Sequence, residues 1–236
     1  MLLLKFKQKG LFIMNNEMRI GVALPHTRKY YDALFVKSFF LMEKPFDMAL
    51  LTPNSTGPID TVRNELCTQA LMLDCTHVFW MDCDQVYPPN TLTKLIGHNL
   101  PIVCAKVHRR HPPYDALLKR YNPNKEDKLE PYIDIEYDEW ALRANPLELI
   151  EVDATGFGCN LMQIEVIERI KQPWFMMNLY VKPVIGEDMY FWEQAKKLGY
   201  KIMVDCSIDV GHISEAVVNH RTYVEWRKMQ KLHGLG

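Results

Sequence analysis

A short apolar run that ends in two aspartates and a proline pair constrains this chain more than any other stretch. Residues 77–81 are rich in Val, Phe and Trp, which is typical of a buried strand. Asp82 and Asp84 follow directly, and Pro88 and Pro89 prevent the strand from continuing. In an open α/β sheet, ligands bind at the carboxyl ends of strands, so both carboxylates are predicted to lie at a binding edge.

The spacing of the two aspartates predicts a divalent metal site. Two ionised carboxylates this close repel each other, and a cation with oxygen ligands is the simplest way to keep both charged. The alternative is a turn in which Asp82 and Asp84 only accept hydrogen bonds from nearby amides. The Asp-x-Asp pair by itself does not decide between the two.

Strand-like and helix-like segments alternate along most of the chain. Strands are predicted at 19–24, 47–51, 77–81, 102–107, 149–153, 201–204 and 208–213, and helices at 31–42, 60–74, 90–99, 163–171 and 186–198. This alternation predicts a three-layer α/β/α domain with a mostly parallel central sheet. Asp60 is expected to cap its helix, and residues 154–162 are expected to form a glycine-rich turn that approaches a ligand.

Three stretches depart from the alternation. Residues 1–17 are expected to precede the domain as an extension, the domain itself to span 18–215, and 216–236 to form an exposed C-terminal helix. Residues 108–146 are rich in Pro, Tyr, Asn and charged side chains. This composition predicts an irregular connection that serves as a lid or a binding loop.

Composition excludes several classes of protein. The 236 residues carry a formal net charge of -1, so no general attraction to nucleic acid is expected. No apolar run approaches the ~18–20 residues of a membrane span, and no transmembrane segment is expected. The six cysteines include no Cys-x-x-Cys pair, which favours free thiols in a reducing cytoplasm over disulfides or structural zinc.

Charged residues at predicted helix starts are the next candidates for a site. Arg63 falls in the first turn of the helix predicted at 60–74, where a cation opposes the helix dipole. It is expected to serve either as a phosphate contact or in a surface ion pair. Glu187 and Asp188 open the helix predicted at 186–198, where plain capping is the alternative to a functional role.

Taken in order, these signals resemble the GT-A glycosyltransferases that use nucleotide-diphospho-sugars, over roughly residues 19–213. The resemblance implies that Asp82-Cys83-Asp84 is the Asp-x-Asp signature of that family. It assigns the metal to Asp84 and the late His212, with Asp82 at the metal, at its bound water or at the ribose. Because an imidazole ligand favours Mn²⁺ over Mg²⁺, Mn²⁺ is the expected ion and Mg²⁺ the alternative.

The same resemblance extends to the donor and the acceptor. The predicted donor-binding residues are Pro25, His26, Arg63, Asp82, Lys106 and Gly156. Glu187 and Asp188 match the acidic pair near the acceptor, with Asp188 as the catalytic base of an inverting transfer.

The resemblance therefore implies a metal-dependent hexosyltransferase. It would move a sugar from a UDP- or GDP-sugar to a carbohydrate or another hydroxyl acceptor. No Gln-x-x-Arg-Trp follows the acidic pair, which argues against a processive polysaccharide synthase. The sequence leaves the sugar, the base, the acceptor and the oligomeric state open.

Two other functions fit some of these residues. Asp82-Cys83-Asp84-Gln85-Val86 also matches the nucleophile loop of haloacid-dehalogenase-like phosphatases, in which Asp82 would be phosphorylated and Asp84 would act as acid and base. That loop normally follows the first strand of its domain, whereas here two predicted strands and two predicted helices precede it. The third possibility is a protein that binds a nucleotide-sugar without turning it over.

Overall fold

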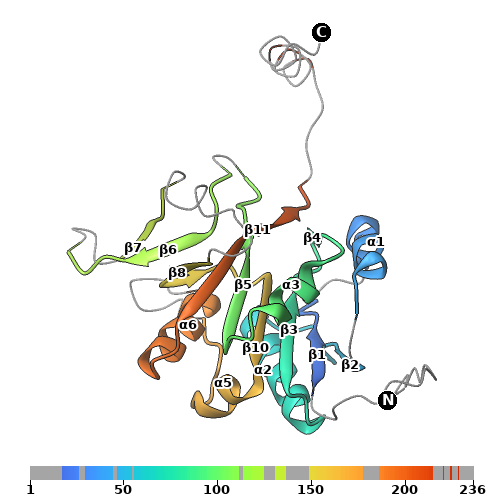
Figure 1. Ribbon diagram of the computed structural model, residues 1–236, viewed down its shortest axis with the longest axis vertical. Helices are drawn as coiled ribbons and strands as arrows, with labels where there is room; N and C mark the ends of the chain where they lie inside the picture. Colours follow the sequence, from blue (N-terminus) through green and yellow to red (C-terminus); the bar gives the residue numbers. More distant parts are fainter. Residues whose placement is uncertain are drawn as a thin grey trace.

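An eight-stranded sheet with helices on both faces forms the body of the molecule (Figure 1). The computed structural model describes residues 18–26, 30–44, 47–54, 56–111, 114–124, 131–136, 149–177, 186–214, 220, 224 and 228. The predicted extension at 1–17 and nearly all of the predicted helix at 216–236 lie outside these residues, so both stay predictions.

The elements follow one another in a mixed α/β order. They are β1 (Arg19–Ala23), α1 (Ala33–Leu41), β2 (Asp47–Leu51), α2 (Ile59–Met72), β3 (His77–Met81), β4 (Gln85–Val86), α3 (Thr91–Gly97), β5 (Ile102–Val107), β6 (Leu118–Tyr121), β7 (Tyr132–Asp134), β8 (Leu149–Val152), β9 (Ala154–Thr155), β10 (Cys159–Gln163), α5 (Ile164–Arg169), α6 (Glu187–Lys197) and β11 (Ile202–His212). None of these helices has the length and apolarity needed to cross a bilayer within the described part of the chain.

The strands of the large sheet run in the order β2-β1-β3-β10-β5-β11-β4, and β8 pairs with β11. β1 is parallel to β2 and β3, and β5 is parallel to β11. β10 is antiparallel to both β3 and β5, so these two blocks of parallel strands point the same way. The carboxyl ends of β1, β3, β5 and β11 therefore meet at one edge, and the predicted mostly parallel sheet is confirmed.

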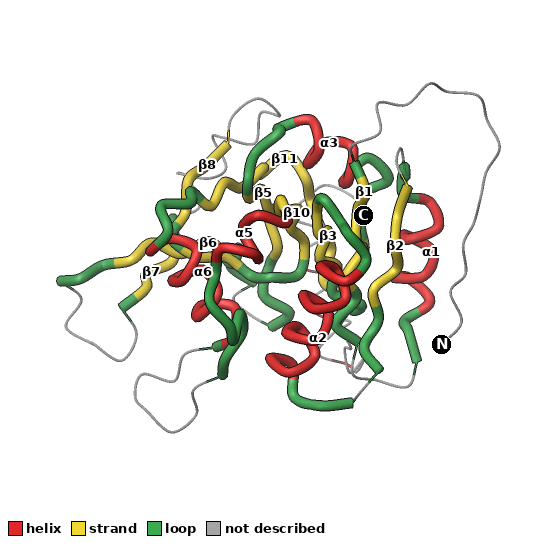
Figure 2. Tube along the Cα trace, turned by 90° about the horizontal axis from the view of Figure 1, so that it is seen from below, coloured by secondary structure: helices red, strands yellow, loops and turns green. Residues whose placement is uncertain are grey.

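Helices cover the two faces of the sheet, as the view from below shows (Figure 2). Buried side chains of α2, α5 and α6 join one apolar cluster, and those of α1 and α3 join another. β3 divides its side chains between them, since Val78 and Trp80 face the first cluster and Phe79 and Met81 face the second. The predicted three-layer arrangement is thus confirmed.

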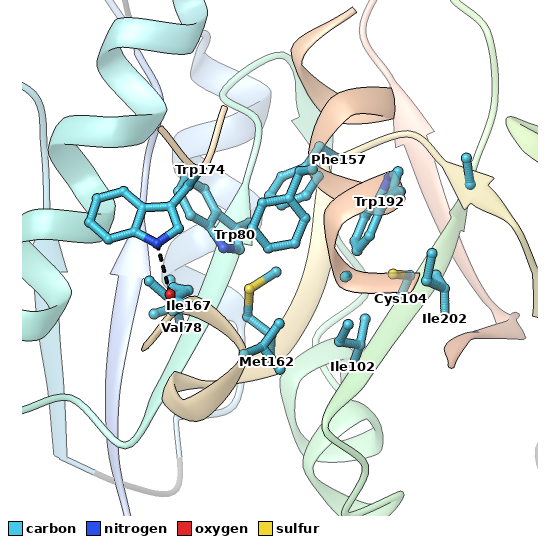
Figure 3. Close-up of a cluster of buried hydrophobic side chains, with 14 of the residues drawn as sticks. Val78, Trp80, Ile102, Cys104, Phe157, Met162, Ile167, Trp174, Trp192 and Ile202 are labelled. Atoms are coloured by element: carbon cyan, nitrogen blue, oxygen red, sulfur yellow. Dashed lines mark hydrogen bonds between the residues drawn. The ribbon is translucent and has the colours of Figure 1, made fainter. Parts of the chain in front are cut away.

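Aromatic rings form the centre of the first cluster (Figure 3). Phe157 packs edge-on against Trp80, with ring centroids 5.2 Å apart, and its ring centre lies 4.7 Å from that of Trp192. The indole N–H of Trp192 donates to the carbonyl of Thr155 at 2.7 Å. Burying these large rings anchors α6 and the β9–β10 turn onto the sheet.

β10 was missed by the sequence prediction, which placed a glycine-rich turn across 154–162. Cys159 and Leu161 belong to one buried cluster and Met162 to the other, so the strand is covered on both faces. A strand buried on both sides lacks the alternation of apolar and polar residues that marks a half-exposed strand. Only the turn between β9 and β10 keeps the predicted glycine-rich character.

The two strands predicted at 201–204 and 208–213 are one strand, β11, with a bulge between Asp205 and Asp209. The buried Asp205 carboxylate accepts hydrogen bonds from the amide of Ser207 at 2.8 Å and from its hydroxyl at 2.6 Å. His98 Nε2 lies 2.8 Å from the same carboxylate. These contacts satisfy the backbone at the bulge, so the strand continues past it.

Two smaller predictions were also wrong. α2 begins at Ile59 with Pro58 at its N-cap, and the Asp60 carboxylate instead accepts from the amides of Thr61 at 2.8 Å and Met177 at 3.2 Å. The stretch 108–146 is not wholly irregular, because β6 and β7 form a three-stranded sheet with β9. Residues 112–113, 125–130 and 137–148 lie outside the described part of the chain, so a lid stays a prediction.

Phe191 provides a test of the aromatic cluster. Its ring is fully buried and stacks 4.8 Å from Phe175, so Phe191→Ala should lower the free energy of unfolding by about 3–5 kcal/mol through lost burial and a cavity. Urea denaturation measures this change. Phe40→Ala is the control, because Phe40 on α1 is 78% exposed and its loss should leave stability near that of the wild type. Equal effects of the two substitutions would contradict the assignment of the core.

Candidate functional site

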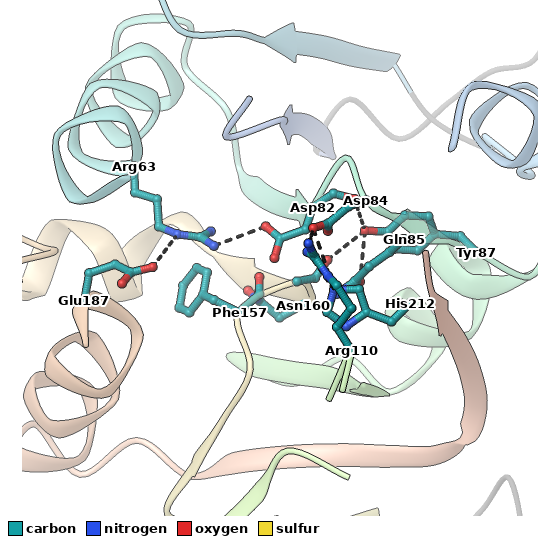
Figure 4. A network of polar contacts seen from close by, with 11 residues as sticks. Arg63, Asp82, Asp84, Gln85, Tyr87, Arg110, Phe157, Asn160, Glu187 and His212 are labelled. Atoms are coloured by element: carbon teal, nitrogen blue, oxygen red, sulfur yellow. Dashed lines mark hydrogen bonds and ion pairs between the residues drawn. The ribbon is translucent and has the colours of Figure 1, made fainter. Parts of the chain in front are cut away.

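Polar residues from three segments converge at the carboxyl edge of the parallel strands (Figure 4). Asp82 and Asp84 follow β3, Arg110 follows β5, and His212 ends β11. Because β3, β5 and β11 point in the same direction, their carboxyl ends bring these side chains together. This is the edge that the sequence predicted as a binding site.

The Asp82–Asp84 loop is held by contacts to the β9–β10 turn. The amide of Asp82 donates to the carbonyl of Gly158 at 2.9 Å. The Tyr87 hydroxyl lies 2.8 Å from the carbonyls of both Asp82 and Gly158. A Cβ atom at position 158 would lie 2.1 Å from Nε2 of the buried Gln85, so any larger residue there would force the Gln85 side chain to move.

His212 reaches Asp84 through strand pairing. β4 pairs antiparallel with the end of β11, with His212 opposite Gln85, and the amide of Ile213 donates to the carbonyl of Asp84 at 2.8 Å. As a result, His212 Nε2 lies 3.7 Å from the Asp84 carboxylate. The other ring nitrogen, Nδ1, lies 2.8 Å from the carbonyl of His108, which directs Nε2 toward Asp84.

Arg110 completes this group, and the sequence analysis did not assign it to the site. Its guanidinium contacts the Asp84 carboxylate directly. Its Nε and Nη2 atoms lie 3.4 Å and 3.2 Å from His212 Nε2. A signal was present in the sequence, because Arg110 follows a predicted parallel strand at the same edge as the aspartates.

The surroundings of Asp84 and His212 shift the pKa values of both side chains. Burial alone would raise the pKa of Asp84, but the neighbouring His212 imidazole and the charge of Arg110 together lower it below its usual value. The Asp84 carboxylate, 3.7 Å away, raises the pKa of His212, while burial and the Arg110 guanidinium oppose that rise. Asp84 is therefore an anion that faces one fixed cation and one titratable ring.

Arg63 forms a second charged group beside the first. Its side chain is only 4% exposed, and its Nη2 lies 3.1 Å from the Asp82 carboxylate. Its Nε lies 3.4 Å from the Glu187 carboxylate at the start of α6. The guanidinium also lies 4.8 Å from the ring centre of Phe157. The ion pair that the sequence offered as an alternative thus exists, but it is buried; the donor contact stays a prediction.

These positions test whether a metal ion fits. Among the described residues no group of three carboxylate, imidazole or thiol ligands gathers, because Asp82 turns toward Arg63 and away from the other two. Asp84 and His212 do lie together, and both already face a cation, the guanidinium of Arg110. A carboxylate and an imidazole are a donor set that suits Mn²⁺, so two of the three predicted ligands fit the ion.

The remaining predicted donor residues are spread along the same edge. Pro25 is buried after β1, and the ring of His26 stacks on Tyr31 with centroids 4.0 Å apart. Lys106 in β5 is largely buried, and its Nζ lies 3.0 Å from the Asp209 carboxylate. A Cβ atom on Gly156 would come within 2.9 Å of Leu117, so this glycine allows close packing of the chain itself.

Asp188 in the first turn of α6 has a raised pKa. Burial, followed by repulsion from Glu187, raises the pKa of Asp188 to about 6, while the Met189 amide and Arg63 oppose the rise. The sequence analysis considered capping as the alternative role, but the N-cap residue is Gly186 and no side chain caps the helix. The Asp188 carboxylate accepts instead from the adjacent Met189 amide at 2.7 Å.

Comparison with known proteins supports the fold. No protein-family model and no curated protein matches the sequence. Among solved structures, A197 from STIV matches with a TM-score of 0.53 and 17% identity, over 86% of this chain and 97% of that one. GalNAc-T7, crystallised with UDP, GalNAc and Mn²⁺, matches with a TM-score of 0.54 and 11% identity, over 84% of this chain and 44% of that one. At these identities the likeness shows the fold alone, which is of the GT-A type.

The raised pKa of Asp188 predicts a specific dependence of stability on pH. Its folded pKa of about 6 exceeds the ordinary value of 3.8, so ionisation of this carboxyl destabilises the folded state as pH rises from about 4 to about 6. Asp188→Asn removes that ionisation. Relative to wild type, the variant should therefore gain about 1–3 kcal/mol of unfolding free energy across this interval and keep the gain above it.

Urea denaturation at a series of pH values measures the difference. Glu193→Gln is a matched control, because Glu193 lies on the same helix and pairs with Lys197 at a partly exposed position. A difference between Asp188→Asn and wild type that stays constant from pH 4 to pH 7 would contradict the raised pKa of Asp188.

Proposed function

We propose that this protein is a metal-dependent glycosyltransferase that moves a sugar from a nucleotide-diphospho-sugar to a hydroxyl acceptor. The observation that carries the proposal is the pairing of the Asp84 carboxylate with the His212 imidazole at the carboxyl edge of a GT-A-type sheet. A fold neighbour crystallised with UDP, GalNAc and Mn²⁺ supports this class of donor and metal.

The metal would be held by Asp84 and His212, with the carbonyl of His108 orienting the imidazole. When bound, a divalent cation such as Mn²⁺ neutralises the charge that develops on the departing diphosphate. Asp82 acts beside it as an anion fixed by Arg63, available to bound water or to the ribose of the donor. Pro25 and His26 form the part of the edge that receives the base, and Lys106 and Gly156 complete the donor side.

Asp188 is the base that takes the proton of the acceptor hydroxyl. A carboxyl with a pKa of about 6 is mostly ionised at neutral pH, yet it is a stronger base than an ordinary aspartate. Glu187 is engaged with Arg63, which leaves Asp188 as the member of the acidic pair without an ion pair among the described contacts. This division supports an inverting transfer in which Glu187 braces the site and Asp188 reacts.

The phosphatase alternative is less well supported. A phosphorylated nucleophile at Asp82 needs a carboxylate free to attack, whereas this one lies 3.1 Å from a buried arginine. The loop also follows the third strand in sequence, with β1 and β2 ahead of it. Phosphatase activity is nevertheless easily assayed beside transfer.

Binding of nucleotides tests the metal part of the proposal. Wild type should bind UDP or GDP in the presence of Mn²⁺ and lose that binding in EDTA, because the diphosphate and the protein share the ion. Asp84→Ala should abolish the metal-dependent part, while its melting temperature without metal stays near that of wild type. Isothermal titration calorimetry measures both. Nucleotide binding that is the same with Mn²⁺, with EDTA and in the variant would refute a metal-dependent site.

Turnover tests the role of Asp188. A panel of nucleotide-sugars with Mn²⁺, and p-nitrophenyl phosphate as the phosphatase control, first identifies a donor. Asp188→Asn should then cut turnover by about 10²–10⁴-fold, the usual contribution of a positioned acid–base group, with donor affinity unchanged. In wild type, turnover should rise with pH through about 6 as Asp188 loses its proton.

The stereochemistry of the product provides the control for this assignment. An inverting transfer gives the anomeric configuration opposite to that of the donor, which NMR of the product detects. A retained configuration would remove the need for a base at this position and would reassign Asp188 to acceptor binding.

A further inference from the structure

The guanidinium of Arg110 lies where the proposed metal ligands meet (Figure 4). It contacts Asp84, and both its Nε and its Nη2 approach His212 Nε2, at 3.4 Å and 3.2 Å. A guanidinium offers only N–H donors and keeps its charge at every physiological pH. The Arg110 guanidinium therefore lies against the same carboxylate and the same imidazole nitrogen that a metal ion would use.

A divalent cation and this guanidinium cannot share the two ligands. Both are positive, and both take a place beside the Asp84 carboxylate and His212 Nε2. A metal ion that binds there must therefore displace Arg110. The Asp84 side chain is only 29% exposed, so little solvent is available to screen one cation from the other.

The backbone beside Arg110 allows the side chain to move alone. The segments before and after it are tied together, since the Arg109 amide donates to the carbonyl of Asp115 at 2.9 Å and the Leu117 amide donates to the carbonyl of Val107 at 2.8 Å. An isolated bridge also joins His108 to Ala116. The Arg110 side chain itself is 32% exposed, so it is in contact with solvent.

We propose that the Arg110 side chain holds the position between Asp84 and His212 until a divalent ion enters, and that it then moves onto the donor's diphosphate. Planar guanidinium groups bind phosphate oxygens in pairs, and the diphosphate would lie against the same metal. The proposal rests on the proposed glycosyltransferase function for the identity of the donor. Arg110 then lowers the affinity for the metal ion and raises the affinity for the donor.

Binding of Mn²⁺ alone is the first test. The loss of the EPR signal of free Mn²⁺ measures this binding, in a mildly alkaline buffer that keeps His212 neutral. Arg110→Gln keeps the length of the side chain and removes its charge. It should bind Mn²⁺ about tenfold more tightly than wild type, within the usual range for two linked binding events. Arg110→Lys, which keeps the charge, should stay near wild type.

Arg109→Gln is the matched control. Arg109 is the neighbouring residue, but its Nη2 lies 3.8 Å from Asp134, away from the two metal ligands. This variant should bind Mn²⁺ as wild type does. Equal Mn²⁺ affinities of wild type and Arg110→Gln, or an equal gain in Arg109→Gln, would overturn the proposed competition.

Nucleotide binding is the second test. With saturating Mn²⁺, Arg110→Gln should bind UDP or GDP about tenfold or more weakly than wild type, as expected when a hydrogen bond to a charged group is lost. Unchanged nucleotide affinity would overturn the move onto the diphosphate. The Mn²⁺ titration contains no nucleotide, so its outcome does not depend on transferase activity. Conversely, competition for Mn²⁺ without any turnover of nucleotide-sugars would count against the proposed function and leave Arg110 as a gate to a metal site.

Discussion

The buried guanidinium of Arg63 is the interaction on which the rest of the site depends. A charge that is almost fully withdrawn from water must be paired, because leaving it unpaired is costly. The partners come from two segments far apart in sequence, Asp82 after β3 and Glu187 at the start of α6. Rings of Trp80 and Phe157 enclose the same group. One side chain on α2 therefore fixes the Asp82 loop relative to the helix that carries Asp188.

This arrangement also explains why the two aspartates point apart. Each carboxylate has its own cation, Arg63 for Asp82 and Arg110 for Asp84, so each negative charge is balanced by a separate guanidinium. The two cations differ in burial, since Arg63 is 4% exposed and Arg110 is 32% exposed. The guanidinium of Arg63 thus belongs to the buried interior, whereas that of Arg110 lies closer to solvent.

Sequence reasoning worked where a single segment determines the outcome. Buried apolar runs bounded by turn residues gave β2, β3 and β5 their correct limits, and the carboxyl end of β3 proved to be the edge where the polar residues meet. It failed where distant residues decide. β10 lies between β3 and β5 and lacks alternation, the buried Asp205 keeps β11 continuous through its bulge, and Arg110 enters the site only through the placement of β5. No local pattern contains these contacts.

The acidic pair at α6 shows how one structure can give adjacent carboxylates different properties. Glu187 lies 3.4 Å from Arg63, whereas the Asp188 carboxylate accepts from the amide of Met189. Burial, followed by repulsion from Glu187, raises the pKa of Asp188 to about 6. The burial that makes Asp188 a stronger base also destabilises the folded state at neutral pH. A purely structural carboxylate would gain nothing from such a position. The cost in stability at Asp188, next to the well-paired Glu187, therefore supports the proposal that this side chain takes part in the chemistry of the site.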